Sequence, residues 1–154
     1  MSKTNINIKN KKAKFQYELL DSYTAGIKLV GTEIKAIREG KATITESFCE
    51  FSDKGELFVV NMNIQEYSHA SHFNHNPKNE RKLLLNKNEL KKLYKEVRNS
   101  GLTIIPLRLF INDRGYAKLV ISLAKGKKLY DKREDIKKRE TGRQLDRVKK
   151  AFNN

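Results

Sequence analysis

The chain has 154 residues, of which 38% are hydrophobic and 33% are charged, a composition that suits one small domain with polar extensions. It has no apolar stretch long enough to span a bilayer, no apolar segment of a signal peptide and only one cysteine, so a disulfide framework is excluded and a cytoplasmic protein is expected. The formal net charge of +15 favours a polyanion as the partner.

The N-terminal part of the chain predicts a polar start, extended chain and a short helix. Residues 1–9 are polar and are expected to be flexible, with the folded domain expected from residue 10 to residue 128. Alternating apolar residues predict a strand over residues 15–20, and residues 27–30 predict further extended chain between two glycines. Thr32 fits the N-cap of a short helix that ends at Gly40.

Two β-hairpins are predicted from strand-forming segments that flank polar turns. The first joins residues 43–51 to residues 56–64 around a Ser-Asp-Lys-Gly turn, and the second joins residues 103–111 to residues 116–124. Pro106 cannot donate a backbone hydrogen bond, so it is expected at an edge or a bulge. Between the hairpins, residues 65–79 predict a loop, and Asn88 is expected to cap a helix that ends at Gly101.

The element order predicts a mainly β fold with short helices. About six strands in antiparallel hairpins and two helices favour a small, partly open barrel of the oligonucleotide-binding type (OB fold) over a parallel α/β fold. Residues 129–154 contain few apolar side chains, and Gly142 interrupts their helix-forming composition. This basic tail is expected to be disordered alone and to become ordered on a partner.

The charge is concentrated at the two ends. Residues 1–14 hold five lysines and no acid, residues 125–154 hold 12 bases and 5 acids, and residues 15–124 hold 16 bases and 13 acids. Basic ends on a nearly balanced body are typical of a domain whose arms bind a polyanion, and RNA is the expected one. A charge excess that serves only solubility is the alternative.

No pattern indicates catalysis. His69, His72 and His75 have a spacing that raises the possibility of a zinc site, but a polar loop without a clear fourth ligand favours surface histidines near RNA. The chain has no phosphate-binding loop, no nucleophile elbow and no carboxylate cluster, so neither an enzyme nor a cofactor is expected.

Basic residues at element boundaries are the candidate RNA contacts, and they are expected to meet on one side of the barrel. Leu84 offers an apolar contact, Asn86 a base-edge donor and acceptor, and Tyr130 a stacking ring; the alternatives are a core side chain, a helix cap and an ordinary exposed tyrosine. The basic candidates, with the glycine that allows close approach to phosphate, are Lys11, Lys12, Lys14, Arg81, Lys82, Lys125, Gly126, Lys127 and Lys128.

Several motifs in order resemble those of the SsrA-binding protein family, also called small protein B, the bacterial partner of transfer-messenger RNA (tmRNA) in trans-translation. The similarity covers residues 10 to about 139. The motifs are Asn10-Lys11-Lys12-Ala13-Lys14, Ala25-Gly26-Ile27, Gly31-Thr32-Glu33-Ile34-Lys35, Arg38-Glu39-Gly40-Lys41-Ala42, Arg81-Lys82-Leu83-Leu84-Leu85, Ala124-Lys125-Gly126-Lys127-Lys128 and Asp131-Lys132-Arg133-Glu134.

The resemblance implies a barrel that binds the tRNA-like domain of tmRNA through Asn10, Leu84 and Asn86, with the lysines around Gly126 facing the RNA. Thr24 stands where the family often has glutamate, and Tyr130 where it often has histidine. The implied tail enters the decoding site and the empty mRNA channel of a stalled ribosome for ribosome rescue, as a helix. Its residues are Tyr130, Asp131, Lys132, Arg133, Ile136, Lys137, Lys138 and Arg139.

The resemblance also implies a monomer with elongation factor Tu as a partner through the shared RNA complex. Two alternatives stay open on the residues alone. One is a ribosomal or other structural RNA-binding protein with basic arms, which would copurify with ribosomal subunits. The other is an RNA-modifying enzyme, which would need a cofactor or metal site.

Overall fold

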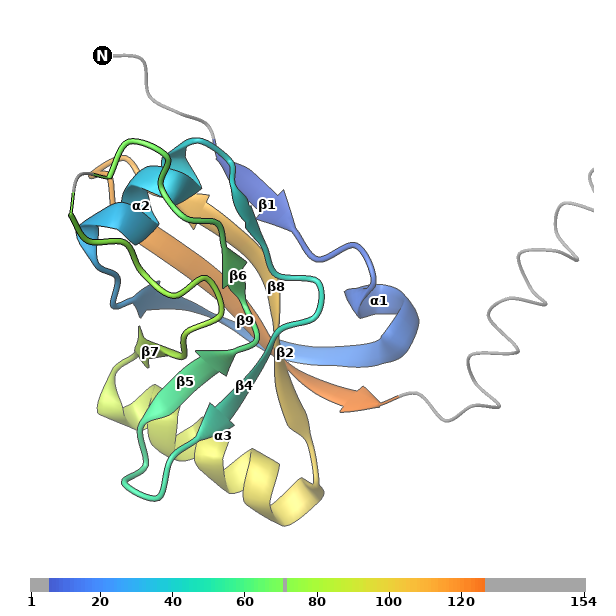
Figure 1. The fold of residues 1–154 in the computed structure, drawn as a ribbon. Helices are drawn as coiled ribbons and strands as arrows, with labels where there is room; N and C mark the ends of the chain where they lie inside the picture. The colour runs from blue at the N-terminus through green and yellow to red at the C-terminus, as the bar shows by residue number, and fades with distance from the viewer. Residues whose placement is uncertain (1–5, 71, 127–154) are drawn as a thin grey trace, which may run out of the picture.

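The computed structural model describes residues 6–70 and 72–126 (Figure 1). The basic tail expected over residues 129–154, together with Lys127 and Lys128, lies outside the described residues. The helices are α1 (Ala13–Gln16), α2 (Gly31–Arg38) and α3 (Lys87–Ser100). The strands are β1 (Asn7–Lys9), β2 (Tyr17–Ile27), β3 (Ala42–Thr43), β4 (Phe48–Phe51), β5 (Leu57–Val60), β6 (Asn63–Ile64), β7 (Arg81–Leu84), β8 (Thr103–Ile111) and β9 (Ala117–Gly126).

The strands form a closed antiparallel barrel, which confirms the mainly β prediction. The main sheet runs in the order β1-β8-β4-β5-β7-β2-β9, and β9 pairs again with β8, so six strands close a ring and β1 extends it. β3 and β6 form a separate two-stranded ribbon. In the view of Figure 1, α2 lies at the top of the barrel and α3 at the bottom.

The barrel interior is filled by side chains from alternate strand positions. Leu57 and Val59 of β5 are fully buried two residues apart, as the period of a strand requires, while α2 contributes Ile37 and α3 contributes Leu93. Burying one such side chain stabilises the fold by about 1.5–3 kcal/mol. The hydrophobic core therefore joins both helices to the barrel.

A second, smaller apolar cluster joins α1 to the strands. Ala13 of α1, Ile105 of β8 and Ala124 of β9 are buried together, and Tyr17, Leu19 and Leu107 pack against them. Since α1 has only four residues, its position depends on this packing and not on its own helical stability.

The N-terminal elements differ from the sequence-based expectation. Residues 7–9, expected within a flexible segment, form β1 and pair with residues 108–110 of β8. Ile8 packs against the core, but one apolar residue in a three-residue strand is too weak a pattern to predict the strand from the sequence. Residues 13–16 form α1, so the strand expected from residue 15 begins at Tyr17. It continues past Gly26 to Ile27, with an irregularity in its pairing with β9 between Leu19 and Ser22.

The other differences concern short elements. The strand β7 was not predicted, and each half of the first hairpin is divided into two strands. Asn86, not Asn88, caps α3: its Oδ1 accepts from Glu89 N at 2.9 Å, in a capping box. The helix ends at Gly101, whose φ of 64° is the expected left-handed cap. The second hairpin is confirmed, with the expected bulge next to Pro106.

Candidate nucleic-acid interface

Asn10 fixes the turn that leads into α1. Its backbone N–H donates to Leu107 O at 2.8 Å, and its side-chain Nδ2 donates to Pro106 O at 2.9 Å. Its Oδ1 accepts from Lys12 N at 3.3 Å. These bonds engage both ends of the amide, so in this structure Asn10 positions the neighbouring lysines. This role differs from the direct RNA contact that the family resemblance implies for it.

The packing of α1 gathers one group of predicted lysines, here called the basic corner: Lys11, Lys12, Lys14 and Lys125. All four are exposed. Ala13 packs against Ala124, the residue before Lys125, so the lysines around α1 lie near the end of β9. A hollow of about 360 Å³ lies among Lys11, Lys14 and Arg108. Lys12 makes an exposed ion pair with Glu46 at 3.3 Å, which contributes about 0–1 kcal/mol.

Three further candidates, Thr24, Leu84 and Asn86, lie with Lys118 on the outer surface of β7, β2 and β9, and these four residues are here called the outer patch. Leu84, the last residue of β7, is 51% exposed. Gly26 pairs with both Leu84 and Lys118. A Cβ placed on Gly26 would lie 3.4 Å from Leu84 Cβ and 3.7 Å from Lys118 Nζ, so both side chains lie next to the glycine on the same face of the sheet.

Asn86 combines a structural role with a free donor. Its Oδ1 is used by the α3 cap, but no hydrogen bond in the described part of the chain uses its Nδ2. The residue is exposed and follows Leu84 by two positions. The prediction of a base-edge contact and the alternative of a helix cap are therefore compatible.

The two predicted bases of β7 have opposite environments. Lys82 points outward and makes a half-exposed ion pair with Glu56 at 3.2 Å. Arg81 is 2% exposed and pairs with the buried Glu33 of α2. The Arg81 guanidinium also donates to the carbonyl oxygens of Met62 at 2.6 Å, Asn76 at 3.1 Å and Pro77 at 3.0 Å.

The interpretation of Arg81 as an RNA contact is therefore corrected. Adjacent strand residues face opposite sides of the sheet, so one base of the pair faces inward. The hydrogen bonds of Arg81 connect three parts of the chain in one buried polar cluster: α2, β7 and the loop that follows β6.

The histidine loop is also partly internal. His75 is buried, with Nε2 bonded to Ile64 O at 2.8 Å and Nδ1 to Thr32 Oγ1 at 2.9 Å. A carbonyl can only accept, so Nε2 donates, and a neutral ring then accepts the Thr32 hydroxyl at Nδ1. This corrects the prediction of three surface histidines, since only His69 and His72 are exposed. Among the described residues, no group of three potential ligands is placed to hold a metal.

The basic corner and the outer patch are separate surfaces connected by β2. Tyr17 pairs with Gly126 at the basic corner, and Gly26 pairs with Leu84 at the outer patch. These positions of β2 are nine residues apart, or at most about 30 Å along a strand. Among the described residues, four of the predicted bases therefore lie at the basic corner, Lys82 lies near the outer patch and Arg81 is buried. Lys118 was missed, although its outward position in the alternation of β9 marks it as a surface cation.

Comparisons with known proteins agree with these motifs. A family model described as SmpB protein matches residues 7–151. The SsrA-binding protein of Christiangramia forsetii is 75% identical over 150 residues, covering 97% of this chain and 95% of the relative. The SsrA-binding protein of Flavobacterium johnsoniae is 63% identical, covering 96% of this chain and 97% of the relative.

A solved structure described as "tmRNA-SmpB: a journey to the center of the bacterial ribosome" has a similar fold. Its TM-score is 0.69 at 44% identity, and the match covers 85% of this chain and 94% of that chain. None of the helices in the described part of the chain is long and apolar enough to cross a membrane. With a family match over most of its length, the chain belongs to the SmpB protein family.

Proposed function

We propose that this chain binds tmRNA and acts with it on stalled ribosomes in trans-translation, in the cytoplasm. The observation that supports this most strongly is the outer patch, where a half-exposed leucine, a free amide donor and a cation lie together on the barrel. The family membership supports it as well, since the relatives are SsrA-binding proteins and the matched structure is described with tmRNA and the ribosome.

The outer patch provides the contacts that a folded RNA domain requires. Leu84 offers an apolar surface to a base or ribose, and Asn86 Nδ2 donates to an acceptor on a base or the backbone. Thr24 is exposed on β2, so its hydroxyl is available where many family members have a carboxylate. We assign the tRNA-like domain of tmRNA to this surface.

The basic corner contributes phosphate contacts that are independent of sequence. Four exposed lysines at the corner, with Lys82 and Lys118, amount to about six cations, so the slope of log K against log salt is expected to be about −4 to −5. The cations increase affinity, while the outer patch selects the RNA.

The tail completes the proposal, although it lies outside the described residues. Residues Tyr130 to Arg139 are expected to enter the decoding site and the mRNA channel as a helix. The body is expected to bind as a monomer, with elongation factor Tu joined through the shared RNA. This division assigns RNA recognition to the barrel and ribosome function to the tail.

Truncation after Lys128 tests this division. The truncated protein is expected to bind the tRNA-like domain within a few-fold of the full chain, but to support no tagging on stalled ribosomes in a reconstituted translation assay. Equal loss of both activities would contradict the division. Sequencing of RNA copurified with the full chain separates the proposal from a ribosomal protein, since tmRNA should be enriched over ribosomal RNA.

A further inference from the structure

The helix α3 contains all of the net positive charge of the barrel body. It has five bases and two acids, while the rest of residues 15–124 has eleven of each. Four of the bases, Lys87, Lys91, Lys95 and Arg98, follow one another at three- and four-residue spacing. This spacing places them along one flank of the helix, here called the α3 stripe. All four are exposed.

The arrangement of these charges is unfavourable for the isolated helix. Lys87 and Lys91, Lys91 and Lys95, and Lys95 and Arg98 are like-charge neighbours at i+4 or i+3, and each such pair is destabilising. Both acids, Glu89 and Glu96, lie on the opposite flank, three or four residues from Lys92. A helix face that served only solubility would gain from mixing the two signs.

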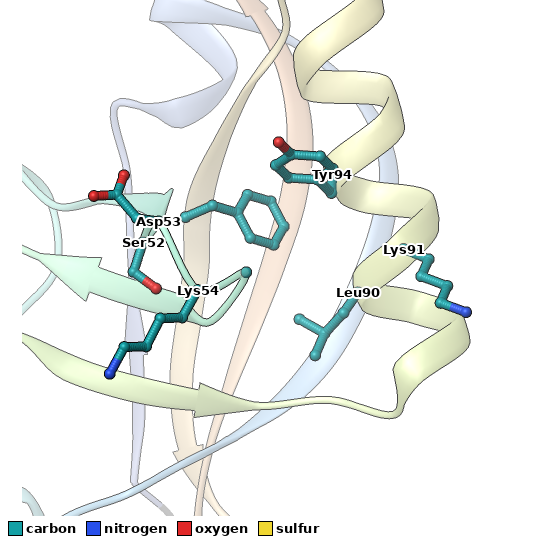
Figure 2. A pocket seen from close by; sticks show the side chains of 8 residues that line it. Ser52, Asp53, Lys54, Leu90, Lys91 and Tyr94 are labelled. Carbon is teal, nitrogen blue, oxygen red and sulfur yellow. The ribbon is translucent and has the colours of Figure 1, made fainter.

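The stripe makes no ion pair that would neutralise it in the described part of the chain. Figure 2 shows the hollow between the β4–β5 turn and α3, with the Lys91 ammonium extending away from it toward the outer surface. Glu50 of β4 and Asp53 of the following turn line hollows beside α3, and neither makes an ion pair with Lys91 or Arg98. The cations of the stripe are therefore available to a partner.

The surface next to the stripe also favours a nucleic acid. Tyr94 is 43% exposed on the side between the stripe and the core, and its ring meets Phe51 edge to face at 5.3 Å. An exposed aromatic ring beside a row of cations is typical of surfaces that bind nucleic-acid chains. The stripe begins at Lys87, the residue after Asn86 of the outer patch, so the two surfaces are continuous along the chain.

We propose that the α3 stripe binds the sugar–phosphate backbone of tmRNA beyond the part that contacts Leu84 and Asn86. The inference depends on the proposed function, because it extends the same RNA along α3. From Lys87 to Arg98 the stripe spans about 16 Å of helix axis, enough to contact several phosphates. The RNA backbone thus leaves the outer patch and follows the helix across the bottom of the barrel in Figure 1.

The test compares two full-length variants that lose the same charge. One combines Lys87→Gln, Lys91→Gln, Lys95→Gln and Arg98→Gln, which keep helix propensity. The control combines Lys35→Gln, Arg38→Gln, Lys78→Gln and Arg114→Gln, exposed residues outside α3 in α2, the loop after β6 and the β8–β9 turn. Binding to full-length tmRNA is measured by filter binding at several salt concentrations, after thermal unfolding confirms that both variants fold.

The α3 variant is expected to lose about tenfold or more in affinity at moderate salt, and its salt slope is expected to fall by about three. The control is expected to change the slope by less than about one. The inference would be overturned if both variants lowered tmRNA affinity equally or if the α3 variant left tmRNA affinity unchanged. It would also be overturned if the α3 variant lost affinity for ribosomes but not for tmRNA. Failure of the wild-type chain to bind tmRNA would instead contradict the proposed function.

Discussion

Arg81 is expected to stabilise the fold without contributing to RNA affinity, and Arg81→Leu tests this directly. The change removes the buried partner of Glu33 and three donors to carbonyl oxygens. The Glu33 carboxylate would keep the Val30 N–H at 2.9 Å but would stay buried without a counter-charge. Breaking a buried pair on one side typically costs 3–5 kcal/mol, so a loss of about 4 kcal/mol in the free energy of unfolding is expected.

The double variant Glu33→Leu with Arg81→Leu is the matched control. It removes both charges, so no unpaired carboxylate remains, and it is expected to recover roughly half or more of the loss. The assay is urea unfolding of the full chain for each variant, together with RNA binding at a temperature where the variant is folded.

The folded Arg81→Leu protein is expected to bind the tRNA-like domain within a few-fold of wild type. A stability change below about 1 kcal/mol would refute the structural role. Normal stability with a tenfold loss of RNA affinity would restore Arg81 as a contact.

Three further predictions concern Asn86, Leu84 and Cys49. Asn86→Ser keeps a good helix cap but removes the amide donor, so RNA affinity should fall while stability changes by only a few tenths of a kcal/mol; Asn86→Ala should lower both, with about 1 kcal/mol lost in unfolding by urea. Leu84→Ala should weaken binding to the tRNA-like domain several-fold with little loss of stability, because the side chain is half exposed; a large stability loss would show that Leu84 is a core residue. Burial raises the pKa of the Cys49 thiol far above its usual range, so the thiolate is scarce at neutral and mildly alkaline pH and a thiol reagent should label the protein only as it unfolds; rapid labelling of the folded protein would contradict the burial of Cys49.

The hairpins and α3 could be predicted from the sequence because their signals are local. Residues 103–111 and 116–124 are rich in strand-forming apolar residues and flank a polar turn, and α3 has helical spacing with a glycine at its end. The β1 strand could not be found in this way, because its three residues are held by pairing with β8 about one hundred positions away. Short strands of this kind depend on tertiary packing, which a local pattern does not contain.

The candidate site shows the same limit. Among Arg81, Lys82, Leu83 and Leu84, composition alone cannot tell which residues face outward, because a shift of one position exchanges the two faces. Pairing of β7 with β2 and β5 settles the register, with Arg81 and Leu83 inside and Lys82 and Leu84 outside. Local charge density marked Lys11, Lys12, Lys14 and Lys125, which are exposed, but it could not show that Lys82 lies on a different surface along β2.

The most direct test of the central claim is a comparison of RNA affinities for the full chain at about physiological salt. One RNA is the tRNA-like domain of tmRNA, and the other is an unrelated duplex of equal length and charge. Since specific contacts add to a shared electrostatic contribution, a preference of roughly a hundredfold or more for the tRNA-like domain is predicted. Equal affinity for the two RNAs would mean that the barrel recognises only charge, and would contradict the function proposed for its outer patch.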